Sequence, residues 1–301
     1  MKKIPLGSSG LGLTFFVLTQ AYFIAHMSLI AELFFGVGTL IYIVTLIQWS
    51  LDAKSVFKGL KESEFGGVIP TVGMGVMVYA SIHYHFFKGN FTLLYTLFWI
   101  GLGVFVILSL VFWYFQFRNF SIKNVYPSWY IPSVGILVVA IAGYNFNLHI
   151  LALWVTLCGI ILFLVVTRMI LVRFFYEILD FEKIKGSFAI CAAPASLIVL
   201  SSSRFAELHW VMLLFLFFSI VIIFFVYIMV IKIIFREFHP SLVSVTFPIA
   251  ISAVAIQQAV ILISNVEIKI TLIGIAGIEL VVATLIAIYV LIGYGIWIFK
   301  K

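Results

Sequence analysis

The chain has 301 residues, of which 64% are hydrophobic and only 10% are charged, and its mean hydropathy is +1.26. This composition excludes a soluble globular domain, in which about 25% of the residues are charged. The net charge of +7 comes without a basic cluster with interleaved aromatic residues, so we expect no nucleic-acid partner. The composition predicts a protein that lies almost entirely in the lipid bilayer.

Ten apolar runs follow one another along the chain, each about as long as the ~20 helical residues that cross a bilayer. The first run is too long for the core of a signal peptide and ends without a small-x-small cleavage site, so we interpret it as the first span. The sequence thus predicts an all-α polytopic membrane protein with ten transmembrane helices. The runs cover residues of about 6–26, 28–50, 66–86, 91–115, 129–147, 149–175, 187–204, 209–236, 241–262 and 268–298.

The basic residues are distributed unevenly between the two sides that these spans define. One side carries both termini and the loops after even-numbered spans, and it holds fifteen of the eighteen Lys and Arg residues. The positive-inside rule therefore predicts cytoplasmic termini and a multi-pass protein of the plasma (inner) membrane. The fifteen are Lys2, Lys3, Lys54, Lys58, Lys61, Arg118, Lys123, Arg168, Arg173, Lys183, Lys185, Lys232, Arg236, Lys300 and Lys301, and the other side holds Lys88, Arg204 and Lys269.

The seven prolines reveal an internal repeat, because every one of them falls at or in an odd-numbered span. A spacing near 60 residues corresponds to two membrane helices with their loops, which predicts five helical hairpins in a single membrane domain, 1–301. The expected hairpins are about 1–52, 53–117, 118–178, 179–238 and 239–301. The prolines expected to kink the odd-numbered helices are Pro5, Pro70, Pro132, Pro194 and Pro248.

The odd-numbered spans are also rich in small residues, whereas the even-numbered spans are rich in Phe, Leu, Ile and Val. We expect the odd helices to form an inner pore ring and the even helices an outer ring that faces lipid. The alternative is a solid inner core, since small residues also let helix backbones pack closely. The candidate pore-lining residues are Ser8, Gly73, Ser133, Ser196 and Ser244.

Phe247 stands directly before Pro248 in the ninth span, among small residues. A bulky ring beside a kinked helix is able to plug a hole, because irregular helices at membrane depth survive where they line a cavity. The alternative is that Phe247 is one of 32 phenylalanines and packs against lipid or core. On these residues alone, ordinary packing is favoured.

Glu279 lies near the middle of the tenth span, about 16 Å from its start. Carboxyl groups at membrane depth are costly and often functional, which makes Glu279 a candidate proton-linked residue. The alternative is a neutral carboxyl bonded to a neighbouring helix, and we favour it because the tenth span belongs to the expected outer ring.

Other chemistry is not indicated by the sequence. Cys158 and Cys191 lie in apolar runs and are expected to pack as small hydrophobic residues. His83 and His85 are two residues apart and point to different sides of a helix, which argues against a metal site. No nucleophile with a partner base is evident. We therefore expect no enzyme, no catalytic residue, no metal and no cofactor.

Short signatures at hairpin spacing carry a resemblance to a known family. They are IPLGSSGLGL (4–13), VIPTVGMG (68–75), YPSWYIPSVG (126–135), CAAPASLIV (191–199) and SVTFP (244–248). With them the chain resembles the tellurite-resistance and C4-dicarboxylate transporter family, to which the plant guard-cell slow anion channels also belong. The resemblance implies a homotrimer with one pore of five inner helices in each protomer, and a pore-occluding phenylalanine that corresponds to Phe247.

The expected function is a transmembrane anion channel or transporter. The odd-numbered spans offer no acidic residue to attract cations, whereas hydroxyls and helix N-termini stabilise negative charge. The expected partners are the lipid bilayer and small anions, such as chloride, nitrate, sulfite or small dicarboxylates. One alternative is a proton-coupled exporter of dicarboxylates or of oxyanions such as tellurite and sulfite. Another is a non-conducting structural or sensory membrane protein.

Overall fold

The computed structural model describes residues 5–118, 120–176, 188–234 and 238–299, and within these ranges it is helical with no strand. Lys2, Lys3, Lys183, Lys185, Arg236, Lys300, Lys301 and the predicted hairpin boundary at 178–179 lie outside the described residues. The helices are α1 (Ser8–Ile24), α2 (Ser28–Leu51), α3 (Ala53–Gly59), η1 (Gly66–Val68), α4 (Thr71–Phe87), α5 (Phe91–Arg118), η2 (Ile122–Asn124), η3 (Pro127–Trp129), α6 (Tyr130–Val134), α7 (Leu137–Tyr144), α8 (His149–Tyr176), η4 (Ala189–Cys191), α10 (Ala192–Ser202), η5 (Ala206–Leu208), α11 (His209–Ile234), η6 (Pro240–Leu242), α12 (Val243–Leu262) and α13 (Val266–Phe299).

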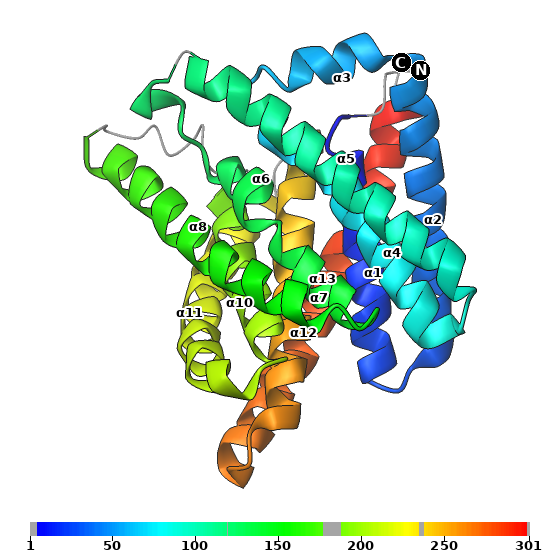
Figure 1. Cartoon of the computed structure of the whole chain (residues 1–301), viewed down its shortest axis with the longest axis vertical. Coiled ribbons are helices and arrows are strands. Elements are labelled where there is room, and N and C mark those ends of the chain that lie inside the picture. Colours follow the sequence, from blue (N-terminus) through cyan, green and yellow to red (C-terminus); the bar gives the residue numbers. More distant parts are fainter. Residues whose placement is uncertain (1–4, 119, 177–187, 235–237, 300–301) are drawn as a thin grey trace.

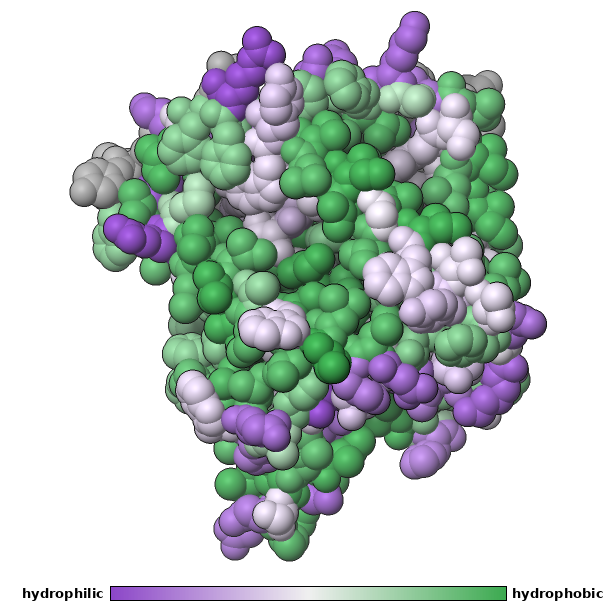
Figure 2. All heavy atoms as spheres, viewed as in Figure 1, coloured by the Kyte–Doolittle hydropathy of each residue, from purple (hydrophilic) through white to green (hydrophobic). Residues whose placement is uncertain are grey.

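Seven helical segments in the described residues are long and apolar enough to cross a membrane, and they contain α2, α4, α5, α8, α11, α12 and α13. An eighth span arises if η3–α6 and α7 are counted together across their 44° bend. The segments Ser8–Ile24 and Ala189–Ser202 are apolar but shorter. Figure 2 shows hydrophobic side chains over the middle of one face, with hydrophilic ones gathered toward its upper and lower edges. A multi-pass, all-α membrane protein is thereby confirmed, while the count of ten spans stays a prediction.

Burial separates two kinds of helix. All eleven residues of α10 and fourteen of the seventeen in α1 are buried, and in α4 and α12 the most apolar stretch is 72% and 67% buried. In α2, α5, α8, α11 and α13 the corresponding share is only 22–39%. Large apolar side chains cover the exposed faces of these five helices, as expected of surfaces in contact with lipid.

The buried helices contact one another in a closed order. Helix α1 packs on α4, α4 on α7, α7 on α10, α10 on α12, and α12 returns to α1. Buried hydroxyl pairs join two of these contacts: Ser9 to Thr71 between α1 and α4, and Thr14 to Thr246 between α1 and α12, both at 2.8 Å. Figure 1 shows α8 and α11 along one edge of the bundle and α2 along the other, with α12, α7 and α1 between them.

Each buried helix also packs against the exposed helix that follows it in the chain. These pairs are α1 with α2, α4 with α5, α7 with α8, α10 with α11 and α12 with α13. Single hydroxyl contacts occur at two of the interfaces, where Thr45 donates to Ser8 at 2.9 Å and Ser196 meets Ser219 at 2.8 Å. Neighbours in sequence are therefore neighbours in space, as helical hairpins require.

Four of the buried helices begin with a tight 3₁₀ turn: η1 before α4, η3 before α6, η4 before α10 and η6 before α12. Pro127 and Pro240 occupy the first position of η3 and η6, where the missing proline N–H sacrifices no helical hydrogen bond. The residues before them, Tyr126 and His239, are extended, as residues preceding proline prefer to be.

The five prolines expected to kink the odd-numbered helices occupy different kinds of position. Pro5 precedes α1 and Pro70 caps the start of α4, so neither interrupts a helix. Pro194 is in the first turn of α10, where proline is tolerated. Pro132 lies in α6, just before the 44° bend, and Pro248 lies inside α12, which continues past it as one helix. The measured bend therefore belongs to the fifth span.

Candidate functional site

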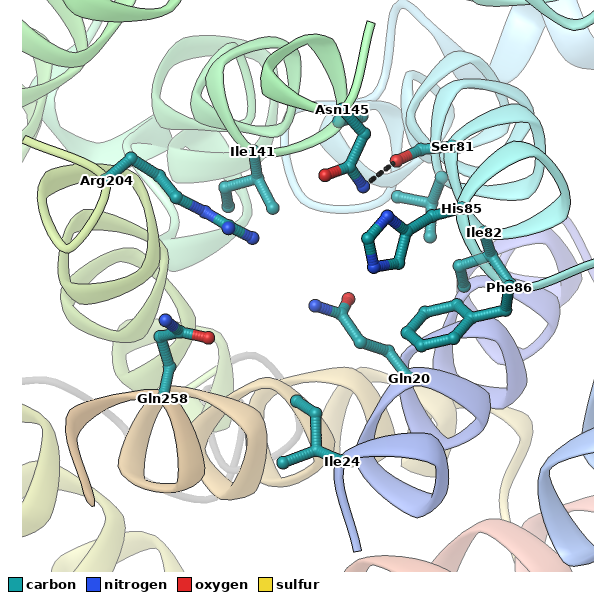
Figure 3. Close-up of a pocket in the computed structure, with 12 residues that line it drawn as sticks. Gln20, Ile24, Ser81, Ile82, His85, Phe86, Ile141, Asn145, Arg204 and Gln258 are labelled. Atoms are coloured by element: carbon teal, nitrogen blue, oxygen red, sulfur yellow. Dashed lines mark hydrogen bonds between the residues drawn. The ribbon is translucent and has the colours of Figure 1, made fainter. Parts of the chain in front are cut away.

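A cavity of about 140 Å³ lies where the C-terminal parts of α1, α4 and α12, the end of α7 and the turn after α10 come together. We call it the axial pocket, because every buried helix contributes to it, directly or through the adjoining turn (Figure 3). Its lining consists of Gln20, Ile24, Val78, Ser81, Ile82, His85, Phe86, Ile141, Ala142, Asn145, Arg204 and Gln258.

Helical periodicity explains why these side chains share one space. On α4, Val78, Ser81, Ile82 and His85 recur at the three- and four-residue steps that align side chains on one helix face. Gln20 and Ile24 are four residues apart on α1, as are Ile141 and Asn145 at the end of α7. The Asn145 amide donates to the Ser81 hydroxyl at 2.8 Å and so links the α7 side of the pocket to α4.

Four long polar side chains point toward the middle of the axial pocket: Gln20, His85, Arg204 and Gln258 (Figure 3). The two amides and the imidazole are each able to donate a hydrogen bond. Among the described residues that line the pocket, none is acidic. The pocket therefore offers hydrogen-bond donors and positive charge but no carboxylate.

Arg204 is the cationic side chain of the axial pocket. Its guanidinium carbon lies 5.1 Å from the centre of the Tyr144 ring, a cation–π contact that holds the side chain without neutralising it. The Nε atom is buried and has no hydrogen-bond partner among the described residues, and no described carboxylate lies within ion-pair distance. Burial lowers the pKa of the Arg204 guanidinium, yet arginine stays protonated in proteins. A bound anion would relieve this desolvated charge.

The helix dipoles at this end of the bundle make the positive charge of Arg204 more important for binding an anion. Helices α1, α4, α7 and α12 all end near the axial pocket, and a helix C-terminus carries a partial negative charge. Those dipoles disfavour an anion unless a cation offsets them. At the opposite end the buried helices begin, and the partial positive charge of a helix N-terminus favours an anion there.

Phe247 lies deeper along the same side of α12. It is half-buried, packs against the core and is not part of the axial-pocket lining. It precedes Gln258 by eleven residues, which is close to three helical turns, so both side chains face the same way about 16 Å apart.

The five candidate pore-lining residues are not in the lining of the axial pocket. Ser8 and Ser196 contact the neighbouring exposed helices α2 and α11 through the hydroxyl pairs described above. Ser133 and Ser244 donate to backbone carbonyl groups of their own segments. A Cβ added at Gly73 would lie 2.5 Å from the backbone nitrogen of Phe105, so this glycine permits the close approach of α4 to α5. Pore lining by these residues stays a prediction.

Glu279 is 2% exposed and faces the neighbouring helices rather than the axial pocket. Its carboxyl lies close to the Ser252 hydroxyl of α12, and the Ser252 hydroxyl oxygen lies 3.5 Å from that of Ser219 on α11. Its second oxygen, Oε2, is buried without a hydrogen-bond partner among the described residues, and so is the nearby Tyr227 hydroxyl. Glu279 thus belongs to a set of polar residues between the buried and the exposed helices. We call this set the interlayer group (Glu279, Ser252, Ser219, Ser196).

Sequence reasoning missed the axial pocket as a site. It identified Arg204 as a basic residue on the sparsely charged side and considered His85 only as a possible metal ligand, without bringing the two together. Gln20 and Gln258 were overlooked. The sequence did contain a signal, because both glutamines occur near the same end of proline-bearing spans. Polar side chains in membrane spans are rare and usually face the interior of the bundle or a water-filled cavity.

The chain is similar to one described protein family and to curated relatives. Residues 3–295 match the family described as SLAC1, voltage-dependent anion channel. Two curated relatives from Methanocaldococcus jannaschii are named uncharacterized transporter MJ0762, 32% identical over 133 residues, and uncharacterized transporter MJ0576, 30% identical over 115 residues. The alignments cover 42% and 36% of this chain, and they span only 38% and 32% of the relatives' own lengths.

Proposed function

Because this chain belongs to the voltage-dependent anion channel (SLAC1) family, we propose that it passes small anions through the membrane along the axis of its buried helices. The observation that carries the proposal is Arg204, a cation without a described carboxylate partner, in a cavity to which all the buried helices contribute. A cavity that served only packing would be apolar or would pair its charges.

The architecture that we propose is a ring of five inner helical spans (α1, α4, α6–α7, α10 and α12) within five outer ones, built from five hairpins as one membrane domain of ten spans. The closed order of contacts and the difference in burial support it. The two shorter segments, α1 and η4–α10, are included because their buried faces and hairpin contacts match those of the longer inner helices.

Phe247 is the residue that we propose as the gate of this path. Two arguments support the assignment: the eleven-residue spacing that puts Phe247 on the same face of α12 as the pocket residue Gln258, and its half-buried state beside residues that are wholly buried. A closed aromatic constriction excludes water, and an ion that enters it must give up hydration without replacement partners.

We further propose that both termini lie in the cytoplasm of a plasma (inner) membrane protein, that the axial pocket opens to the exterior, and that the chain assembles as a homotrimer. Reporter fusions after Lys58 are expected to report the cytoplasm, and those near Lys88 or Lys269 the exterior, as the basic-residue bias requires. A cytoplasmic signal at Lys88 would contradict the ten-span topology.

Proton-coupled export of dicarboxylates or oxyanions is the second candidate function. It is favoured by one observation, namely that the buried Glu279 carboxyl contacts the gate-bearing helix α12 through Ser252. We rank it second because Glu279 lies in the interlayer group and not on the axis, where coupled ions and substrate would meet.

Flux through liposomes tests the proposal directly. Purified full-length protein in potassium-loaded vesicles should release chloride and nitrate at rates well above protein-free vesicles, with anions favoured over potassium. Uptake that requires a pH gradient would favour the proton-coupled exporter. The absence of any anion flux from both the wild-type and the Phe247→Ala protein, each folded and correctly inserted, would leave the structural or sensory alternative.

A further inference from the structure

We propose that the axial pocket is a binding site for one small monovalent anion such as nitrate, held by Arg204, and that it discriminates against C4-dicarboxylates. This inference rests on the proposed function, because it assumes that the pocket lies on the path that anions take. It narrows the anions of the proposed function to small monovalent ones and names the residue that binds them.

Charge is the first argument. Arg204 is the cationic side chain among the described lining residues, and the nearby Lys88 is exposed in the loop after α4. One guanidinium is matched by one negative charge, and a second carboxylate would meet amides and the C-terminal ends of helices. Two charges of a dicarboxylate therefore cannot both be compensated inside the pocket.

Size is the second argument. The axial pocket measures about 140 Å³, close to the ~150 Å³ cavity that accommodates a single benzene molecule. Nitrate, chloride and formate have fewer heavy atoms than benzene, whereas succinate and malate have more. A small anion therefore fits with room for a bridging water, whereas a C4-dicarboxylate would occupy most of the pocket and leave little room for water around its second carboxylate.

Hydrogen-bond geometry is the third argument. Arg204, Gln20, His85 and Gln258 approach the pocket from the turn after α10 and from α1, α4 and α12, so that hydrogen-bond donors surround an anion that binds there (Figure 3). The buried Nε of Arg204 has no other described partner, and a planar oxyanion is the ligand that a guanidinium fork matches best.

The test compares Arg204→Gln with wild-type protein by two readouts. The first is binding in detergent: the Tm measured in sodium nitrate against sodium gluconate of equal ionic strength, which requires no open path. The second is the nitrate concentration that gives half-maximal flux in liposomes. We expect nitrate to raise the wild-type Tm and not that of the variant, and the half-maximal concentration to rise about ten- to a hundred-fold. In wild-type vesicles, malate flux should be at least about tenfold below nitrate flux.

Two further variants separate the pocket from general attraction of anions. Lys269→Gln removes another positive charge from the same side of the protein, away from the axial pocket, and should change the half-maximal concentration less than about twofold, because exposed charges are screened by salt. Arg204→Lys keeps the positive charge but not the forked donor geometry of the guanidinium. Its half-maximal nitrate concentration should therefore lie between those of wild type and Arg204→Gln.

The outcomes distinguish this inference from the proposed function. Anion flux that is unchanged in a folded Arg204→Gln protein, with the nitrate effect on Tm retained, would overturn the binding site and leave the channel intact. Malate that stabilises and permeates as well as nitrate would overturn the discrimination. An Arg204-dependent nitrate effect on Tm without any flux would support the binding site and refute the path.

Discussion

Polar side chains enter the apolar bundle in two places, the axial pocket and the interlayer group, and their hydrogen bonding differs. In the interlayer group, hydroxyls and one carboxyl form a chain of contacts from α10 through α11 and α12 to α13. In the axial pocket, the long polar side chains of four different elements point into open space. Side chains that bond to one another stabilise helix contacts, whereas donors left open are available to a ligand.

The comparison predicts that changes on the axis alter transport and that changes between the layers alter stability. This separation is useful because a membrane protein often loses activity simply by failing to fold. Each variant below is therefore measured twice, by flux per folded protein and by thermal unfolding, and the two readouts should move independently.

Phe247→Ala should have the largest effect on flux. Removal of an aromatic barrier that costs an ion several kcal/mol of hydration is expected to raise anion conductance about a hundred-fold or more. Phe247→Leu should be intermediate. The measurement is chloride and nitrate conductance in liposomes, normalised to folded protein.

The matched control is Phe217→Ala, since this side chain on α11 is 63% exposed on the lipid-facing surface. Its removal should leave conductance unchanged. Conductance of a well-folded Phe247→Ala protein at the wild-type level would refute the gate and support ordinary packing.

Gly73→Val should have the largest effect on stability. The added side chain meets the backbone of Phe105 and Gly101 on α5, which cannot move aside as a side chain can. Overpacking of this kind costs about 1–3 kcal/mol or more, so the yield of folded protein and its Tm should fall. Gly103→Val on α5, where an added Cβ meets nothing within 4 Å, is the control. An unaffected Tm for Gly73→Val would mean that α4 and α5 are not in close contact.

Glu279→Gln tests whether the interlayer group takes part in transport. Glutamine keeps the shape of the side chain beside Ser252 but removes the titratable proton. We expect anion flux within about twofold of wild type and the same dependence on pH, measured as flux between pH 5 and 8. Loss of pH-dependent uptake, with expression and folding intact, would assign proton coupling to Glu279 and promote the second candidate function.

Ser196→Ala should have the smallest effect. It removes the 2.8 Å contact with Ser219 between α10 and α11, and hydrogen bonds between membrane helices are worth about 0.6 kcal/mol on average. The Tm should fall slightly and flux should not change. A large change in flux would show that Ser196 lines the path, as its small polar side chain first indicates.

The sequence was sufficient for the class of protein and for the division of its helices. High hydropathy and evenly spaced apolar runs predict a helical membrane bundle, because helices satisfy their backbone groups internally in lipid. The small residues and prolines of alternate runs single out the helices that are buried in the structure, such as α10 with Pro194 and α12 with Pro248. These are local properties of composition and spacing, so they can be read along the chain.

Only the tertiary structure decided which side chains face the axis. Periodicity determines which residues share a face of one helix, but not how that helix is rotated against its neighbours. Gly73 consequently faces α5 and Ser8 faces α2, while Gln20, His85, Arg204 and Gln258, separated by up to 238 positions, meet in one cavity. Rotation is settled by the packing of all helices at once, which is why the charge of Arg204 becomes significant only after the bundle is assembled.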